Sequence, residues 1–84
     1  MIKKSVAWQE QAMKILDVRP VLAEGGEPFV MIMETAEQLK KGETLLLIAP
    51  FEPVPLYQVL GERGFTHETS IVSVGEWWVL FTRA

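Results

Sequence analysis

The sequence predicts a small α/β (α+β) domain, a two-layer sandwich whose four-stranded mixed sheet carries two helices on one face. Three observations predict this class. A helical apolar period follows Pro28, two segments that are apolar on both faces indicate inner strands, and the elements alternate in the order β-α-β-α-β-β. The 84 residues suffice for one domain, and because none is cysteine, no disulfide can stabilise it.

The N-terminal segment has the weakest pattern. Residues 1–12 predict either an arm or a short helix capped by Ser5, and residues 13–84 are expected to form the single domain. A short strand is expected over Met13–Val18. It ends at Arg19-Pro20, because proline donates no ladder hydrogen bond and drives the preceding residue into an extended conformation.

The first helix of the domain is predicted from Pro28 onward. Proline suits a first helical turn, Lys40 and Lys41 suit the last one, and Gly42 suits the left-handed position that follows. Apolar residues recur with the spacing of one helical face. The residues of this predicted face are Phe29, Ile32, Met33, Ala36 and Leu39.

The remaining elements follow from similar signals. Glu43–Ala49 is apolar on both faces and predicts a central strand, and a second helix is expected from Pro55 to Gly64. The more polar His67–Val74 predicts an edge strand. Gly75-Glu76 then predicts a type II′ turn with glycine first, and Trp77–Thr82 predicts the second inner strand.

One face of this sheet is left without a cover. Two crossovers of the usual right hand put both helices on the same face. The opposite face carries either Trp77 with its alternate neighbours or Trp78 with Leu80. The N-terminal segment with Trp8, or a second subunit in a homo-oligomer, is expected to cover it, because an open apolar face commonly marks an interface.

Composition and motifs narrow the function classes. The net charge is -3 and no basic cluster appears, so nucleic-acid binding is not expected. No apolar run has membrane-spanning length, and no signal peptide is recognised at the start, so the cytoplasm is the expected location. An enzyme is unsupported, since Asp17, Arg19 and the lone His67 are its only polar candidates, and no metal or other cofactor is predicted.

The stretch "LDVRP…GGEPFVMIMETAEQLKKGETLLLIA" resembles the TusA/SirA-like sulfur-carrier superfamily. Members begin with Leu-Asp-x-Arg-Gly-x-x-Cys-Pro-x-Pro, run into a helix, and then start a strand with Gly-Glu-x-Leu. The matching residues are Leu16, Asp17, Arg19, Glu27, Pro28, Gly42, Glu43 and Leu45. "EPVPLYQVL" (Glu52–Leu60) resembles more closely a branch of uncharacterised TusA-related domains, which carry Asp-x-x-Pro-Leu-Tyr before the second helix.

The departures from that pattern exclude the carriers' chemistry. Aligned on Glu27-Pro28, Gly25 takes the place of the persulfide-bearing cysteine and Gly26 that of the proline. A chain without cysteine cannot form a persulfide. The uncharacterised branch also tends to have histidines after its second strand, where this chain reads "APFEP" (Ala49–Pro53), so the metal or haem role that those histidines suggest is not carried over.

Two interpretations of the glycine pair remain open. Gly25 and Gly26 form either a plain turn into the helix or a site where exposed N–H groups hold an anion. Arg19 would add a bidentate contact to such an anion, whereas Glu24 and Glu27 disfavour it. Likewise, Asp17 and Arg19 form either a local ion pair or ligand contacts.

The leading function hypothesis is a non-catalytic module that binds an unknown protein partner. In the carriers that the chain resembles, partner enzymes dock near the start of the first helix. The candidate contact residues are Met31, Phe51, Tyr57, Trp77 and Trp78. The alternative is a small-ligand or anion sensor or carrier that uses Asp17, Arg19 and the glycine loop.

Overall fold

The computed structural model describes residues 3–84, which form a four-stranded mixed sheet with helices packed on it. The strands are β1 (Lys14–Asp17), β2 (Thr44–Ala49), β3 (Phe65–Ser73) and β4 (Glu76–Arg83), and their order across the sheet is β1-β2-β4-β3. β1 and β2 are parallel, and β4 is antiparallel to both of its neighbours. The predicted fold class is confirmed, with β2 and β4 inside and the polar β3 at an edge.

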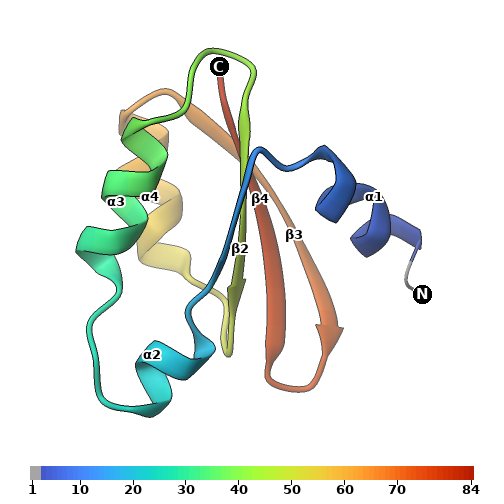
Figure 1. The fold of residues 1–84 in the computed structure, drawn as a ribbon, viewed down its shortest axis with the longest axis vertical. Coiled ribbons are helices and arrows are strands. Elements are labelled where there is room, and N and C mark those ends of the chain that lie inside the picture. The colour runs from blue at the N-terminus through green and yellow to red at the C-terminus, as the bar shows by residue number, and fades with distance from the viewer. Residues whose placement is uncertain (1–2) are drawn as a thin grey trace.

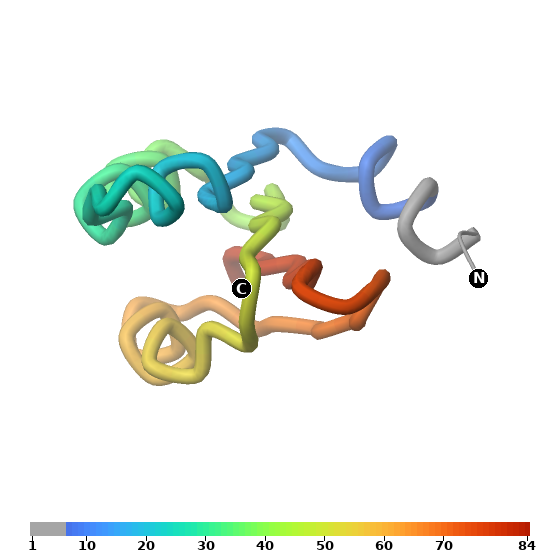
Figure 2. The backbone as a smooth tube through the Cα atoms, turned by 90° about the horizontal axis from the view of Figure 1, so that it is seen from below, coloured from blue at the N-terminus to red at the C-terminus, as the bar shows by residue number. Residues whose placement is uncertain are grey.

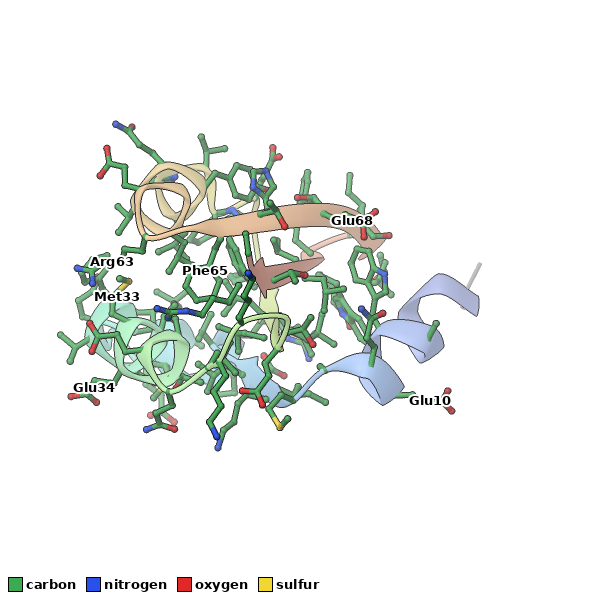
Figure 3. All side chains as sticks on the ribbon, turned by 90° about the horizontal axis from the view of Figure 1, so that it is seen from above. Glu10, Met33, Glu34, Arg63, Phe65 and Glu68 are labelled. Carbon is green, nitrogen blue, oxygen red and sulfur yellow. The ribbon has the colours of Figure 1, made fainter. Side chains whose placement is uncertain are left out.

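Two helices cover one face of the sheet, as expected. They are α3 (Phe29–Glu37) and α4 (Val54–Glu62), and they lie together on one side of the strands (Figure 1). The side chains between these helices and the sheet form one cluster, here called the helix-side core. Its buried members are Val18, Ile32, Met33, Ala36, Leu39, Leu45, Leu47, Ala49, Leu56, Leu60, Phe65, Val79 and Phe81. Figure 3 shows Met33 and Phe65 in this layer, while Glu34 points away from it.

Helix α3 differs from its prediction at both ends. The helix ends at Glu37, before the two lysines, and Gly42 takes its positive φ of 86° in the turn that leads to β2. Phe29 is the first helical residue and is 44% exposed, although its spacing placed it on the buried face. The other four residues of that face are buried.

Two further helices complete the structure. The N-terminal segment forms α1 (Lys3–Gln11), so the helical alternative describes it, but the predicted Ser5 cap is wrong because the helix begins before Ser5. A short helix, α2 (Arg19–Ala23), follows β1 where only a connection was predicted, and its proline lies in the first turn. Proline can therefore end a strand and begin a helix at the same place.

The other face of the sheet is covered by α1. Trp8 is 4% exposed and packs with Leu46, Ile48, Trp78 and Leu80, here called the Trp8 cluster. In the end-on view of Figure 2, α1 lies on the opposite side of the sheet from the other helices. The N-terminal segment thus occupies the face for which a second subunit was the alternative cover.

The β3–β4 turn corrects a detail of the prediction. Ser73 pairs with Glu76, so Val74 and Gly75 are the two central residues, and an irregularity in register lies between Ile71 and Ser73. Gly75 has φ 74° and stands second. A type II′ turn needs the positive φ at its first central residue, so the predicted Gly75-Glu76 turn is wrong.

Candidate functional site

An apolar groove of about 180 Å³ opens at the end of the domain where β1 and β2 finish and α3 and α4 begin. Figure 2 looks toward this end of the molecule. Three parts of the chain line the groove. Val18 and Leu22 come from the end of β1 and from α2; Glu27, Pro28, Phe29 and Ile32 come from the start of α3; Leu47, Ala49, Phe51, Pro53, Pro55 and Leu56 come from the end of β2 and the connection into α4.

The rim of the groove is also apolar. Phe29 and Phe51 line it and are 44% and 54% exposed. Further exposed apolar side chains lie on α3, at Val30 and Met31, and at the start of α4, at Val54. Glu27 is the only charged residue among those that line the groove, so its chemistry is that of apolar contact with one acidic side.

The glycine pair ends α2 and leaves no free N–H groups for an anion. Gly25 N–H donates to the Leu22 carbonyl at 3.0 Å, and Gly26 N–H donates to the Val21 carbonyl at 2.8 Å. These two bonds, with φ 83° at Gly25, are the Schellman motif that closes a helix. A Cβ on Gly26 would lie 2.9 Å from Val21 Cγ1, so only glycine fits there without a shift. The pair is therefore a helix-ending turn, whose helix the sequence did not predict.

The start of α3 is occupied by a side chain of this protein. Glu27 accepts a hydrogen bond from the Phe29 N–H at the end of the helix that attracts anions. The carboxylate thus stands where the anion of the sensor alternative was expected. The N–H groups of Gly25, Gly26 and Phe29 are therefore all taken within the chain.

Asp17 and Arg19 form the expected local ion pair. The guanidinium donates two hydrogen bonds, Nε to Oδ1 at 2.9 Å and Nη2 to Oδ2 at 2.7 Å, and the Arg19 N–H donates a third at 3.1 Å. These bonds lower the pKa of the Asp17 carboxyl and raise that of Arg19. Arg19 Nη1 also lies 3.3 Å from Glu76 Oε1, and Glu76 accepts from the Trp78 indole at 2.7 Å. Arg19 is therefore shared between two carboxylates.

A second polar group lies between α4 and β3. The Tyr57 hydroxyl lies 2.6 Å from Thr69 Oγ1 and donates to Glu52 at 3.1 Å. The Tyr57 ring stacks on exposed His67, with ring centroids 3.8 Å apart and planes 4° apart. Burial raises the pKa of the Tyr57 phenol, and Glu52 raises it further, against the opposing effect of the Thr69 hydrogen bond. These contacts join α4 to the edge strand.

The structure separates the five predicted partner residues. Met31 and Phe51 are exposed and Phe51 lines the groove, whereas Tyr57 and Trp77 are half-buried. Trp78 is 7% exposed beneath α1, so it is not available to a partner in this structure. Phe29 was not predicted as a site residue because its spacing matched the buried face; its place at the very start of the helix was the signal that it would be exposed.

The described part of the chain lacks both a metal cluster and a membrane-spanning helix. No three His, Cys, Asp or Glu residues of that part are grouped as a metal ion requires. Residues 3–84 also contain no helix with the length and apolar character needed to cross a bilayer.

Fold and groove together define a small mixed α/β domain with an apolar recess at its strand ends. The chain belongs to the family described as Uncharacterized conserved protein (DUF2249), whose family model matches residues 15–83. No match was found among curated proteins or among solved structures. The family match covers all four strands except Lys14 of β1 and leaves α1 outside.

Proposed function

We propose that this protein is a non-catalytic binding module that captures one bulky apolar side chain of a protein partner in the apolar groove. The observation that carries the proposal is the groove itself, with exposed Phe29 and Phe51 at its mouth. Exposed apolar surface around a recess is typical of a contact site.

The size of the groove favours a side chain over a cofactor. Its 180 Å³ is close to the roughly 150 Å³ of a cavity that holds benzene, and below the roughly 300–1,000 Å³ of pockets for drug-sized ligands. One aromatic ring or one branched aliphatic chain fits this space. The surrounding apolar residues then give the partner's backbone a surface to lie on.

The family's relationship to TusA/SirA-like carriers forms part of the proposal. The motif residues around Asp17 and Arg19 that match the carriers support this relationship, and so does the order of strands and helices. Glu27 and Pro28, which follow the position matching the carrier cysteine, line the groove. The neighbourhood where carriers meet their partners would then be retained without sulfur chemistry, in a cytoplasmic protein.

The proposal is tested with a minimal probe. N-acetyl-phenylalanine amide and N-acetyl-alanine amide are titrated into isotope-labelled protein, and backbone amide shifts are followed by NMR. We expect saturable shifts around Leu47, Ala49 and Phe29 with the phenylalanine probe. Burying its ring contributes about 1.5–3 kcal/mol, so the alanine probe should bind at least about tenfold more weakly.

Two variants locate the binding. Phe51→Ala removes an exposed side chain that lines the groove. It should weaken binding of the phenylalanine probe by about threefold or more, since part of the contact with the probe's ring is lost. Val30→Ala removes a comparably exposed apolar side chain outside the lining and should leave binding unchanged. Shifts elsewhere on the domain, or equal binding of both probes, would contradict the proposal.

A further inference from the structure

Charge is distributed unequally between the two ends of the domain. The end with the groove carries Asp17, Glu24, Glu27, Glu52 and Glu76, and its cation Arg19 is paired with Asp17 and Glu76. The opposite end, toward which Figure 3 looks, carries Lys14, Lys40, Lys41, Arg63 and Arg83 together with Glu37, Glu43 and Glu62, so its cations outnumber its carboxylates. The groove therefore opens in an acidic environment.

Two of these carboxylates are held by hydrogen bonds: Glu27 lines the groove, and Glu52 directly adjoins two of its lining residues in the sequence. Glu27 is held by its hydrogen bond from the Phe29 N–H. Glu52 stands between Phe51 and Pro53, two lining residues, and accepts from the Tyr57 hydroxyl. Neither carboxylate takes part in an ion pair within the described residues. Both are positioned, and both can accept a cation from outside.

From this arrangement, and resting on the proposed function, we infer that the partner segment is cationic: a bulky apolar residue flanked by lysine or arginine. The apolar side chain enters the groove, and the flanking cations lie against Glu27 and Glu52. Charge complementarity of this kind sets partner choice and association rate. The same carboxylates repel acidic peptides, nucleic acid phosphates and anionic lipid headgroups, which makes a basic protein segment the occupant that fits both the size and the charge.

The test uses short peptides blocked at both ends, with phenylalanine at the centre and either lysine, serine or glutamate on each side. Binding to the whole chain is measured by NMR at low salt and again at about 0.5 M salt, where charges are screened within a few ångströms. We expect the lysine peptide to bind about three- to tenfold more tightly than the serine peptide at low salt, and the glutamate peptide more weakly than both. The difference should fall to about twofold or less at high salt.

Matched variants test the two carboxylates. The double variant Glu27→Gln, Glu52→Gln keeps an oxygen acceptor at both positions and should abolish the preference for lysine. Glu34→Gln removes one charge from the outer side of α3, where Glu34 points away from the core (Figure 3), and should preserve most of the preference. Persistence of the full preference in the double variant would overturn this inference.

The outcomes distinguish this inference from the function on which it rests. Equal binding of the lysine and serine peptides, with shifts at the groove, overturns the cationic partner and supports the groove as a binding site. Absence of groove shifts with every phenylalanine peptide overturns the proposed function itself. So does equal binding of a lysine peptide that carries alanine in place of phenylalanine, because the apolar anchor would then contribute nothing.

Discussion

The two faces of the sheet are closed in different ways. The helix-side core is enclosed by two helices that are tied to the sheet at both of their ends. The Trp8 cluster is covered by one helix, α1, whose C-terminal end leads into β1. β2 contributes to both, since Leu45 and Leu47 face the helix-side core and Leu46 and Ile48 face the Trp8 cluster. One strand thus serves a large core covered by two helices and a small one covered by a single helix.

The largest effect is expected on the helix side. Leu47 is fully buried there between the sheet and the helices, and Leu47→Ala removes most of that side chain, so we expect a loss of about 3–5 kcal/mol in the free energy of unfolding. Leu46 is equally buried on the other face. Leu46→Ala should cost about 2–3 kcal/mol, because α1 can settle into the space. Urea denaturation measures both values, and an equal or reversed order would remove the distinction between the two faces.

Trp8→Ala tests the cover of the smaller cluster directly. Replacing a fully enclosed core tryptophan by alanine lowers the free energy of unfolding by about 3–5 kcal/mol. We expect a loss of about 1–3 kcal/mol here, because α1 can detach while the sheet stays intact. Hydrogen exchange should quicken in α1, with β2 amides still protected. Exposed Gln9 gives the control, since Gln9→Ala on the same helix should leave both readings unchanged. Global loss of protection in Trp8→Ala would show that α1 belongs to the main cooperative unit.

The smallest effect is expected at the turn that ends α2, where the backbone of Gly26 lies close to Val21. Gly26→Ala brings a Cβ within 2.9 Å of Val21 Cγ1 and 3.0 Å of its carbonyl oxygen, and should cost about 1 kcal/mol through local strain. Gly61 lies within α4 with open space around it. Gly61→Ala should stabilise by about 0.5–1 kcal/mol, because alanine is the better helix former. Thermal unfolding of the two variants should shift in opposite directions; a neutral Gly26→Ala would contradict the close approach.

The fold was largely predictable because its signals lie within single segments. The uninterrupted apolar run of β2 requires burial on both faces, and Pro55 and Gly64 bracket α4 by their backbone preferences. Errors arose where one residue fits two local structures. Pro20 was taken as the end of a strand although it also begins α2, and Gly75 can stand first or second in a turn.

The candidate site was less predictable because it is formed by tertiary contact. The sequence drew attention to Phe51 and Met31 near the start of α3, but the groove exists only where α2, α3 and the connection into α4 converge. Neither spacing nor composition reports such convergence. The carboxylate of Glu27 was considered only as a charge, and its hydrogen bond to Phe29 N–H, which fills the anion position, depends on the backbone path.

The place of β4 in the sheet has a consequence for the unfolded chain. β4 pairs with both β2 and β3 and follows both in the sequence, so the sheet cannot be completed in the order in which the chain is synthesised. Until β4 arrives, β2 presents an unpaired edge and a run of leucine and isoleucine without a charge. Segments of this kind associate with other chains when they are left open. Rapid formation of the local β3–β4 hairpin and its docking on β2 therefore protect this protein from aggregation as well as building its core.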